Sequence, residues 1–158
     1  SNMRDAPRVP AEWEIHSLPG AKLNHVTSML RRMKQQLPKD TNLKHVIIQV
    51  GINHRSSLTS KYEYDLGEIC DEISDIGVSS SYCGIAVDCR RLPENEVEKI
   101  NEINNYVKTV WINSYIDPLP ETEIRIQESD VFGIHYTRET IGKIVNRMVD
   151  HINSLSVF

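Results

Sequence analysis

The chain has 158 residues, of which 39% are hydrophobic and 25% are charged, as in an ordinary globular domain. Its formal net charge of −4 and lack of a clustered basic face argue against nucleic-acid binding, and no apolar run is long enough for a transmembrane helix. The length predicts a single domain over residues 1–158. Three cysteines without a Cys-x-x-Cys pair, and no visible signal peptide, predict reduced thiols in an intracellular, cytoplasmic protein.

The first elements are a loop, a short strand, a helix and a buried strand. Residues 3–12 are polar and contain prolines, which predicts a loop, and residues 14–18 can form a strand. A helix is predicted over 22–37 because apolar residues recur there at helical spacing, namely Leu23, Val26, Leu30 and Met33. Residues 44–50 are β-branched and almost entirely apolar, as expected of a strand buried on both faces.

The middle of the chain repeats this alternation. Residues 61–76 carry apolar side chains along one side, so we expect a helix that ends at Gly77. A strand is predicted over 82–87. A helix over 93–110 then begins at a proline, and residues 111–115 form a short last strand.

The last part of the chain is irregular over 117–132 and closes with a helix. Thr137 is typical of an N-cap, because its hydroxyl stands just before Glu139 in the first turn. Strands that alternate with helices predict an α/β fold, here a three-layer α/β/α arrangement around a parallel sheet of flavodoxin-like topology. Ligands bind at the carboxyl ends of the strands in such open sheets, so the loops that follow strands are where we expect the site.

Three short motifs lie in or beside loops of this kind. Residues 17–21 read Ser-Leu-Pro-Gly-Ala, residues 50–53 read Val-Gly-Ile-Asn, and residues 133–137 read Gly-Ile-His-Tyr-Thr. Each motif alone is weak evidence for a function, because the three are also typical of a turn, a loop start and a structural histidine, respectively. Their order along the chain, and their expected meeting at one edge of one sheet, make the set more specific.

Together these motifs resemble the SGNH (GDSL-like) hydrolase superfamily. The chain is most similar to the esterase domain in the first open reading frame protein of vertebrate LINE-type retrotransposons. That group has Gly-Asp-Ser-Asn, a short Arg/Pro-containing loop and a strand that ends in Ser-x-Pro-Gly-Ala; here Ser1-Asn2 and Pro19-Gly20 stand at similar spacing. The similarity continues through residues 50–55, 91–93 and 134–137, and so spans essentially the whole chain.

The resemblance implies a serine esterase that acts on small acyl esters, such as acetyl or lipid esters, without a metal or other cofactor. Ser1 would be the nucleophile and His135 the base that takes its proton. The backbone amides of Ser1 and Gly20 and the side-chain amide of Asn53 would form the oxyanion hole. A lipid substrate would bring the domain to a membrane surface. In that group, RNA binding and self-association belong to other regions of the protein.

The acid that orients the histidine departs from the family pattern. The family places an aspartate three residues before the histidine, where this chain has Phe132. Asp130 stands five residues before His135 and can bend back because Gly133 permits a sharp turn, whereas Glu128 is a poorer candidate. We expect Asp130, or a backbone carbonyl of residues 130–132, within hydrogen-bond reach of the His135 ring. Both a triad and a Ser-His dyad are compatible with the sequence.

Several alternatives stay open at this stage. The family's first strand and the Gly-Asp pair before the serine are not among the 158 residues; either the printed sequence starts inside the domain, or Ser1-Asn2 is a vector-derived remnant. The spacing to Pro19-Gly20 favours the motif. One rival function is an interaction module that has lost turnover, which Phe132 favours, and another is a flavodoxin-like ligand-binding domain. The remaining histidines have no second ligand at metal spacing. His54 follows Asn53, and of its two roles, lining the site or lying in an exposed loop, the sequence favours the exposed loop.

Overall fold

The computed structural model describes residues 9–38, 42–56 and 61–155, where four α-helices surround a three-stranded parallel sheet. The strands are hydrogen-bonded in the order β1 (His45–Ile48), β2 (Ser79–Cys83) and β3 (Tyr115–Ile116). The helices are α1 (Leu23–Gln36), α2 (Tyr62–Ile76), α3 (Glu94–Val110) and α4 (Arg138–Ser154), with 3-10 helices η2 (Ile52–His54) and η3 (Glu121–Glu123) between them. The predicted α/β class with a parallel sheet is confirmed.

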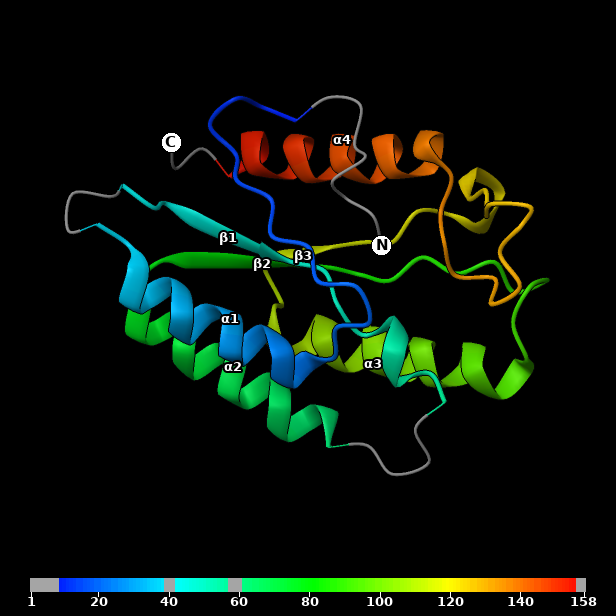
Figure 1. Ribbon diagram of the computed structural model, residues 1–158, viewed down its shortest axis with the longest axis horizontal. Helices are drawn as coiled ribbons and strands as arrows, with labels where there is room; N and C mark the ends of the chain where they lie inside the picture. Colours follow the sequence, from blue (N-terminus) through cyan, green and yellow to red (C-terminus); the bar gives the residue numbers. More distant parts are fainter. Residues whose placement is uncertain (1–8, 39–41, 57–60, 156–158) are drawn as a thin grey trace.

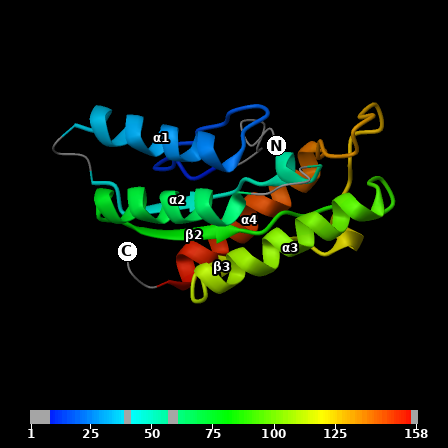
Figure 2. The ribbon, with the colours of Figure 1, turned by 90° about the horizontal axis from the view of Figure 1, so that it is seen from below.

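Helices lie on both faces of the sheet (Figure 1). Helix α4 covers one face, whereas α1, α2 and α3 lie on the other. The buried side chains divide in the same way, because Ile48 packs in a cluster with α1, α2 and α3 while its neighbour Ile47 packs against the α4 side. Seen from below (Figure 2), α1 lies beside α2. An ion pair of 2.7 Å between Arg31 Nε and Glu72 Oε1 joins these two helices.

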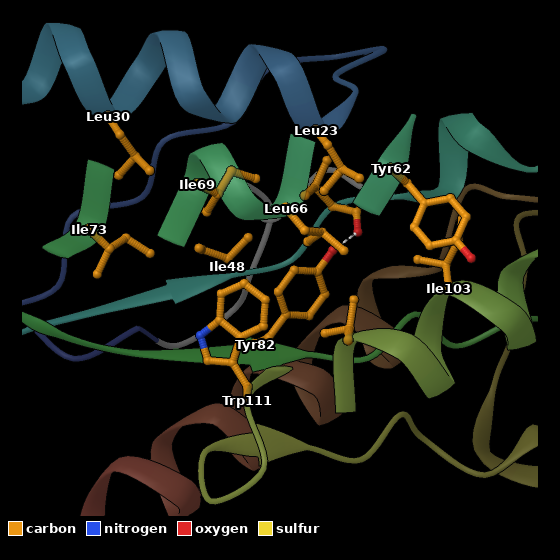
Figure 3. Packing of buried hydrophobic residues seen from close by; sticks show 12 residues of the cluster. Leu23, Leu30, Ile48, Tyr62, Leu66, Ile69, Ile73, Tyr82, Ile103 and Trp111 are labelled. Atoms are coloured by element: carbon orange, nitrogen blue, oxygen red, sulfur yellow. Dashed lines mark hydrogen bonds between the residues drawn. The ribbon is translucent and has the colours of Figure 1, made fainter. Parts of the chain in front are cut away.

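The larger core cluster is centred on Tyr82 of the middle strand (Figure 3). Tyr82 is fully buried, its ring centroid lies 5.0 Å from that of Trp111, and its hydroxyl donates a hydrogen bond to the carbonyl of Val50. Apolar side chains of the helices complete the cluster: Leu23, Leu30, Leu66, Ile69, Ile73, Ile103 and Val107. Removal of this apolar surface from water is the main stabilising contribution, at about 25 cal/mol per Å².

The middle strand is displaced from its predicted position. β2 begins three residues before the predicted 82–87 and leaves the ladder after Cys83. The prediction failed because the serines that open β2 are polar and yet find partners; Trp111 Nε1, for example, donates to Ser80 Oγ at 3.0 Å. Beyond the strand, the side chain of Asn104 bonds both the amide and the carbonyl of Ile85 at 2.9 Å and so takes the place of a neighbouring strand.

Two other strand predictions are corrected. Residues 14–18 form no strand, although burial alternates along them as in a strand, with Ile15 half-buried between exposed neighbours. A strand needs hydrogen bonds along a neighbouring strand, whereas this segment runs into a turn in which the Ala21 amide donates to the Leu18 carbonyl at 3.1 Å. Of the predicted 111–115 strand only Tyr115 is in β3, because the preceding residues turn, with Ser114 N donating to Trp111 O at 3.0 Å.

A chain of hydrogen bonds ties the beginnings of β1 and β2 to α4. His45 Nδ1 lies 2.7 Å from Ser79 Oγ, and His45 Nε2 lies 2.8 Å from Ser81 Oγ. The fully buried Ser81 Oγ also lies 2.8 Å from His151 Nε2. A hydroxyl has one proton, so Ser81 can donate to only one imidazole and must accept from the other. The chain of bonds therefore needs at least one of these two histidines to be neutral.

We expect the domain to lose stability as the pH falls below about 6.5. Burial lowers the pKa of both His45 and His151, and the proximity of His151 lowers the pKa of His45 further. The folded pKa thus lies below the unfolded one, so the stabilisation is complete above the unfolded pKa and is lost as the pH falls through the folded pKa. Urea denaturation between about pH 5 and 8 should show this slope. A double variant, His45→Gln with His151→Gln, should reduce this slope and leave the part that comes from His54, whose pKa burial also lowers; an unchanged slope would contradict the assignment.

Candidate functional site

The loops that follow the strands lie together at one end of the sheet, on the right in Figure 1 and again in Figure 2. An apolar cluster around Ile100 of α3 joins them. Ile52 of η2, Leu92 of the loop after β2 and Ile134 of the loop after β3 all pack in this cluster. The predicted meeting of segments 50–53 and 133–137 at the carboxyl ends of the strands is thereby confirmed.

His135 and Asp130 form a hydrogen-bonded pair. His135 Nδ1 lies 2.9 Å from Asp130 Oδ1; the histidine side chain is 44% exposed and the aspartate side chain 5% exposed. The carboxylate that the sequence placed five residues before the histidine is therefore within the predicted reach. Phe132, at the family's usual acid position, points outward with 62% exposure, and Glu128 lies on the surface.

Backbone amides of its own loop hold the Asp130 carboxylate. Oδ1 accepts the amide of Phe132 at 3.1 Å, and Oδ2 accepts the amides of Ile134 and His135 at 2.7 and 2.6 Å. Burial alone would raise the pKa of Asp130, but the hydrogen bonds from the His135 ring and from these amides hold it well below its usual range. An ionised carboxylate on Nδ1 fixes the ring proton there and leaves Nε2 as the nitrogen that can accept one.

The loop after β2 packs against the turn over residues 130–133 and is hydrogen-bonded to it. Arg91 Nη2 donates to the Asp130 carbonyl at 2.6 Å. Gly133 has a φ of 67°, and a Cβ atom there would stand 2.8 Å from the carbonyl oxygen of Arg91. A side chain at this position would be unfavourable both because of the positive φ and because of the clash with Arg91, so the turn from 130 to 133 requires glycine. The sequence did not predict the role of Arg91, because nothing local signals a contact 39 residues away.

The two described members of the expected oxyanion hole also lie on contacting segments. Asn53 Nδ2 donates to the carbonyl of Ala21 at 2.9 Å, which leaves its second amide proton for another acceptor. Gly20 directly precedes Ala21 in an exposed turn with a φ of 72°. The expected nucleophile, Ser1, lies outside the described residues.

The prediction that His54 lies in an exposed loop is wrong. It is only 6% exposed, and its Nε2 accepts the amide of Leu23 at 3.1 Å. The loop after β1 coils into η2 and turns this ring inward, against the start of α1. The partner is distant in sequence, so no local pattern could have shown it.

Other features and comparisons add no assignment. Within residues 9–38, 42–56 and 61–155, no group of three or more His, Cys, Asp or Glu side chains is arranged to hold a metal ion. Cys70, Cys83 and Cys89 are free thiols. None of the helices in the described part of the chain is long and apolar enough to cross a membrane.

The comparisons with known proteins identify no relative. No protein-family model matches the chain, and no curated protein sequence does.

Proposed function

We propose that this domain is a serine esterase of the SGNH type that hydrolyses small acyl esters. The observation that carries the proposal is the contact of 2.9 Å between His135 Nδ1 and Asp130 Oδ1, in a loop at the carboxyl ends of the strands. An exposed imidazole backed by a buried carboxylate is the arrangement that a general base needs. The parallel sheet with helices on both faces supports the three-layer, flavodoxin-like fold that belongs to this proposal.

In the proposed reaction, the Ser1 hydroxyl attacks the ester carbonyl and passes its proton to His135 Nε2. Asp130 stabilises the imidazolium that forms. The tetrahedral oxyanion is bound by the amides of Ser1 and Gly20 and by the Asn53 side chain. The imidazolium then protonates the leaving alkoxide. Water hydrolyses the acyl-serine by the same proton transfers, releasing the acid and restoring the free serine.

The second candidate function is an interaction module that keeps the fold without turnover. It is favoured by Val131 and Phe132, which are 89% and 62% exposed on the turn that carries Asp130. Adjacent exposed apolar side chains are typical of contact surfaces. On an active esterase the same two side chains would touch the acyl chain of a lipid ester or the membrane that presents it.

Hydrolysis of p-nitrophenyl acetate, combined with a serine-directed phosphonate, separates the two functions. The esterase proposal expects hydrolysis that the phosphonate abolishes, and a single covalent adduct that mass spectrometry locates on Ser1. The Ser1→Ala variant should fold and take up no label. An adduct on another serine would contradict the nucleophile. A protein that neither hydrolyses the ester nor takes up the label would be the interaction module.

We expect Asn53→Ala to lower kcat by roughly 100-fold with a smaller change in KM, because an oxyanion donor acts mainly in the transition state. Steady-state kinetics with the same ester measure both constants. Asn105→Ala is a matched control, since Asn105 is exposed on α3. An effect on KM alone would make Asn53 a substrate contact instead.

A further inference from the structure

Helix α1 begins with an amide whose partner lies on a distant loop. The first amides of a helix have no acceptor inside it and need one elsewhere. The residue before the helix, Lys22, has an ammonium that can only donate hydrogen bonds. The Leu23 amide instead donates to Nε2 of His54, which is 31 residues away, at 3.1 Å. Leu23 and His54 are both buried, so water does not compete for this bond.

The same loop makes a second hydrogen bond to the same segment. Asn53, next to His54 in η2, donates from Nδ2 to the Ala21 carbonyl at 2.9 Å. Two consecutive residues thus hold residues 21–23 through one carbonyl and one amide. Gly20 directly precedes this segment and has a φ of 72°. The position of the Gly20 amide relative to the Asn53 side chain therefore depends on both bonds.

We propose that His54 is a positioning residue that sets the spacing between the two oxyanion donors, the Gly20 amide and the Asn53 side chain. The inference rests on the proposed esterase function. His54 touches no reacting atom in that reaction. It fixes the start of α1 against η2, and this contact sets the position of the adjacent turn that contains Gly20. Misplacement of a reacting or binding group by 1 Å can lower a rate on the order of 100-fold, so a small release of this contact has a measurable effect.

The contact also requires a neutral imidazole. Nε2 can accept the helix amide only when it carries no proton, which places the ring proton on Nδ1. Burial is the main cause that lowers the pKa of His54, and so favours this neutral form. The charged or titratable groups around the ring come from three helices. The pKa of His54 is lowered further by Lys22, the N-cap of α1, by Lys99 of α3 and by His25 of α1. Asp65 of α2 raises it. Protonation would turn an N–H toward an N–H and break the contact.

The test compares His54→Leu with His54→Gln in the intact protein. The leucine variant leaves the Leu23 amide without an acceptor and should lower kcat by roughly 10- to 100-fold, with KM within about twofold. The glutamine amide oxygen stands near the position of Nε2 and can accept the same bond, so this variant should recover most of kcat. Equal losses of kcat in both variants, or an unchanged kcat in His54→Leu, would overturn the proposal.

A second measurement does not depend on hydrolysis. In His54→Leu, amide hydrogen exchange of Leu23 should accelerate, and the NMR signals of Gly20 should shift. Because His25 Nδ1 accepts the Lys22 amide at 3.0 Å, this measurement is made in proteins that carry His25→Gln. In that background the Leu23 and Gly20 amide signals should titrate together with the His54 ring, and adding His54→Gln should abolish this titration. Titration that persists would overturn the positioning role even if His54→Leu does not fold. A protein with His54 that shows this titration, while the wild-type protein shows no ester hydrolysis, would instead contradict the esterase proposal.

Discussion

Asp130→Asn should lower kcat for ester hydrolysis by about 1000-fold or more, because the acid that orients a catalytic histidine fixes its tautomer. An asparagine at this position has no acceptable orientation. If its amide nitrogen replaced Oδ1 it would face the Phe132 amide and His135 Nδ1, and if it replaced Oδ2 it would face the amides of Ile134 and His135. Each orientation sets donors against donors, so we also expect a loss of about 1–3 kcal/mol in the free energy of unfolding.

Kinetics and thermal unfolding of the same samples separate the two effects of this substitution. Glu128→Gln is the matched control, because Glu128 is an exposed acid two residues before Asp130 and should leave kcat within about twofold. A folded Asp130→Asn protein that loses less than about tenfold in kcat would mean a Ser-His dyad oriented by the backbone. That outcome would remove Asp130 from the proposed triad and leave it as a residue that shapes the loop.

Tyr82→Ala should cost about 3–5 kcal/mol of folding free energy, enough to unfold a marginally stable domain. The substitution would leave a cavity in the middle of the largest core cluster and remove the ring against Trp111. Tyr82→Phe keeps the ring and removes only the hydroxyl, which leaves the Val50 carbonyl unpaired, so we expect about 1–2 kcal/mol.

Urea denaturation of the three proteins gives these free energies. Tyr64→Ala is the control, because Tyr64 is 66% exposed on α2 and its loss should change stability by less than about 0.5 kcal/mol. A Tyr82→Ala protein within about 1 kcal/mol of the wild type would show that the sheet is not packed around this ring.

The helices could be predicted from the sequence and the strands only in part. The predicted helices differ from α1 to α4 by about one residue at the ends that were stated, and Thr137 caps α4 by accepting the amide of Thr140 at 3.3 Å. Helix signals are local, since periodicity and caps lie within one segment. Strand limits depend on partners elsewhere: in β2 the polar Ser81 is buried because His45 and His151 bond its hydroxyl.

The same division holds for the site. The approach of Asp130 to His135 could be predicted, because Gly133 and a spacing of five residues allow a tight local turn. The contributions of Arg91 and His54 could not, because each acts on a segment more than 30 residues away in the chain. Ser1 lies outside the described residues, so its role stays a prediction.

The hydrogen bonds of Asp130 affect how the sequence of such a site would change in evolution if catalysis were no longer under selection. The carboxylate that orients the histidine is also the group around which its own loop folds. A descendant that kept this domain only for binding would still need the aspartate to shape the turn, whereas Asn53 would be under weaker constraint. Retention of Asp130 is therefore uninformative about activity, and the first trace of a lost enzyme would be substitutions at the nucleophile and the oxyanion donor beneath an unchanged His–Asp pair.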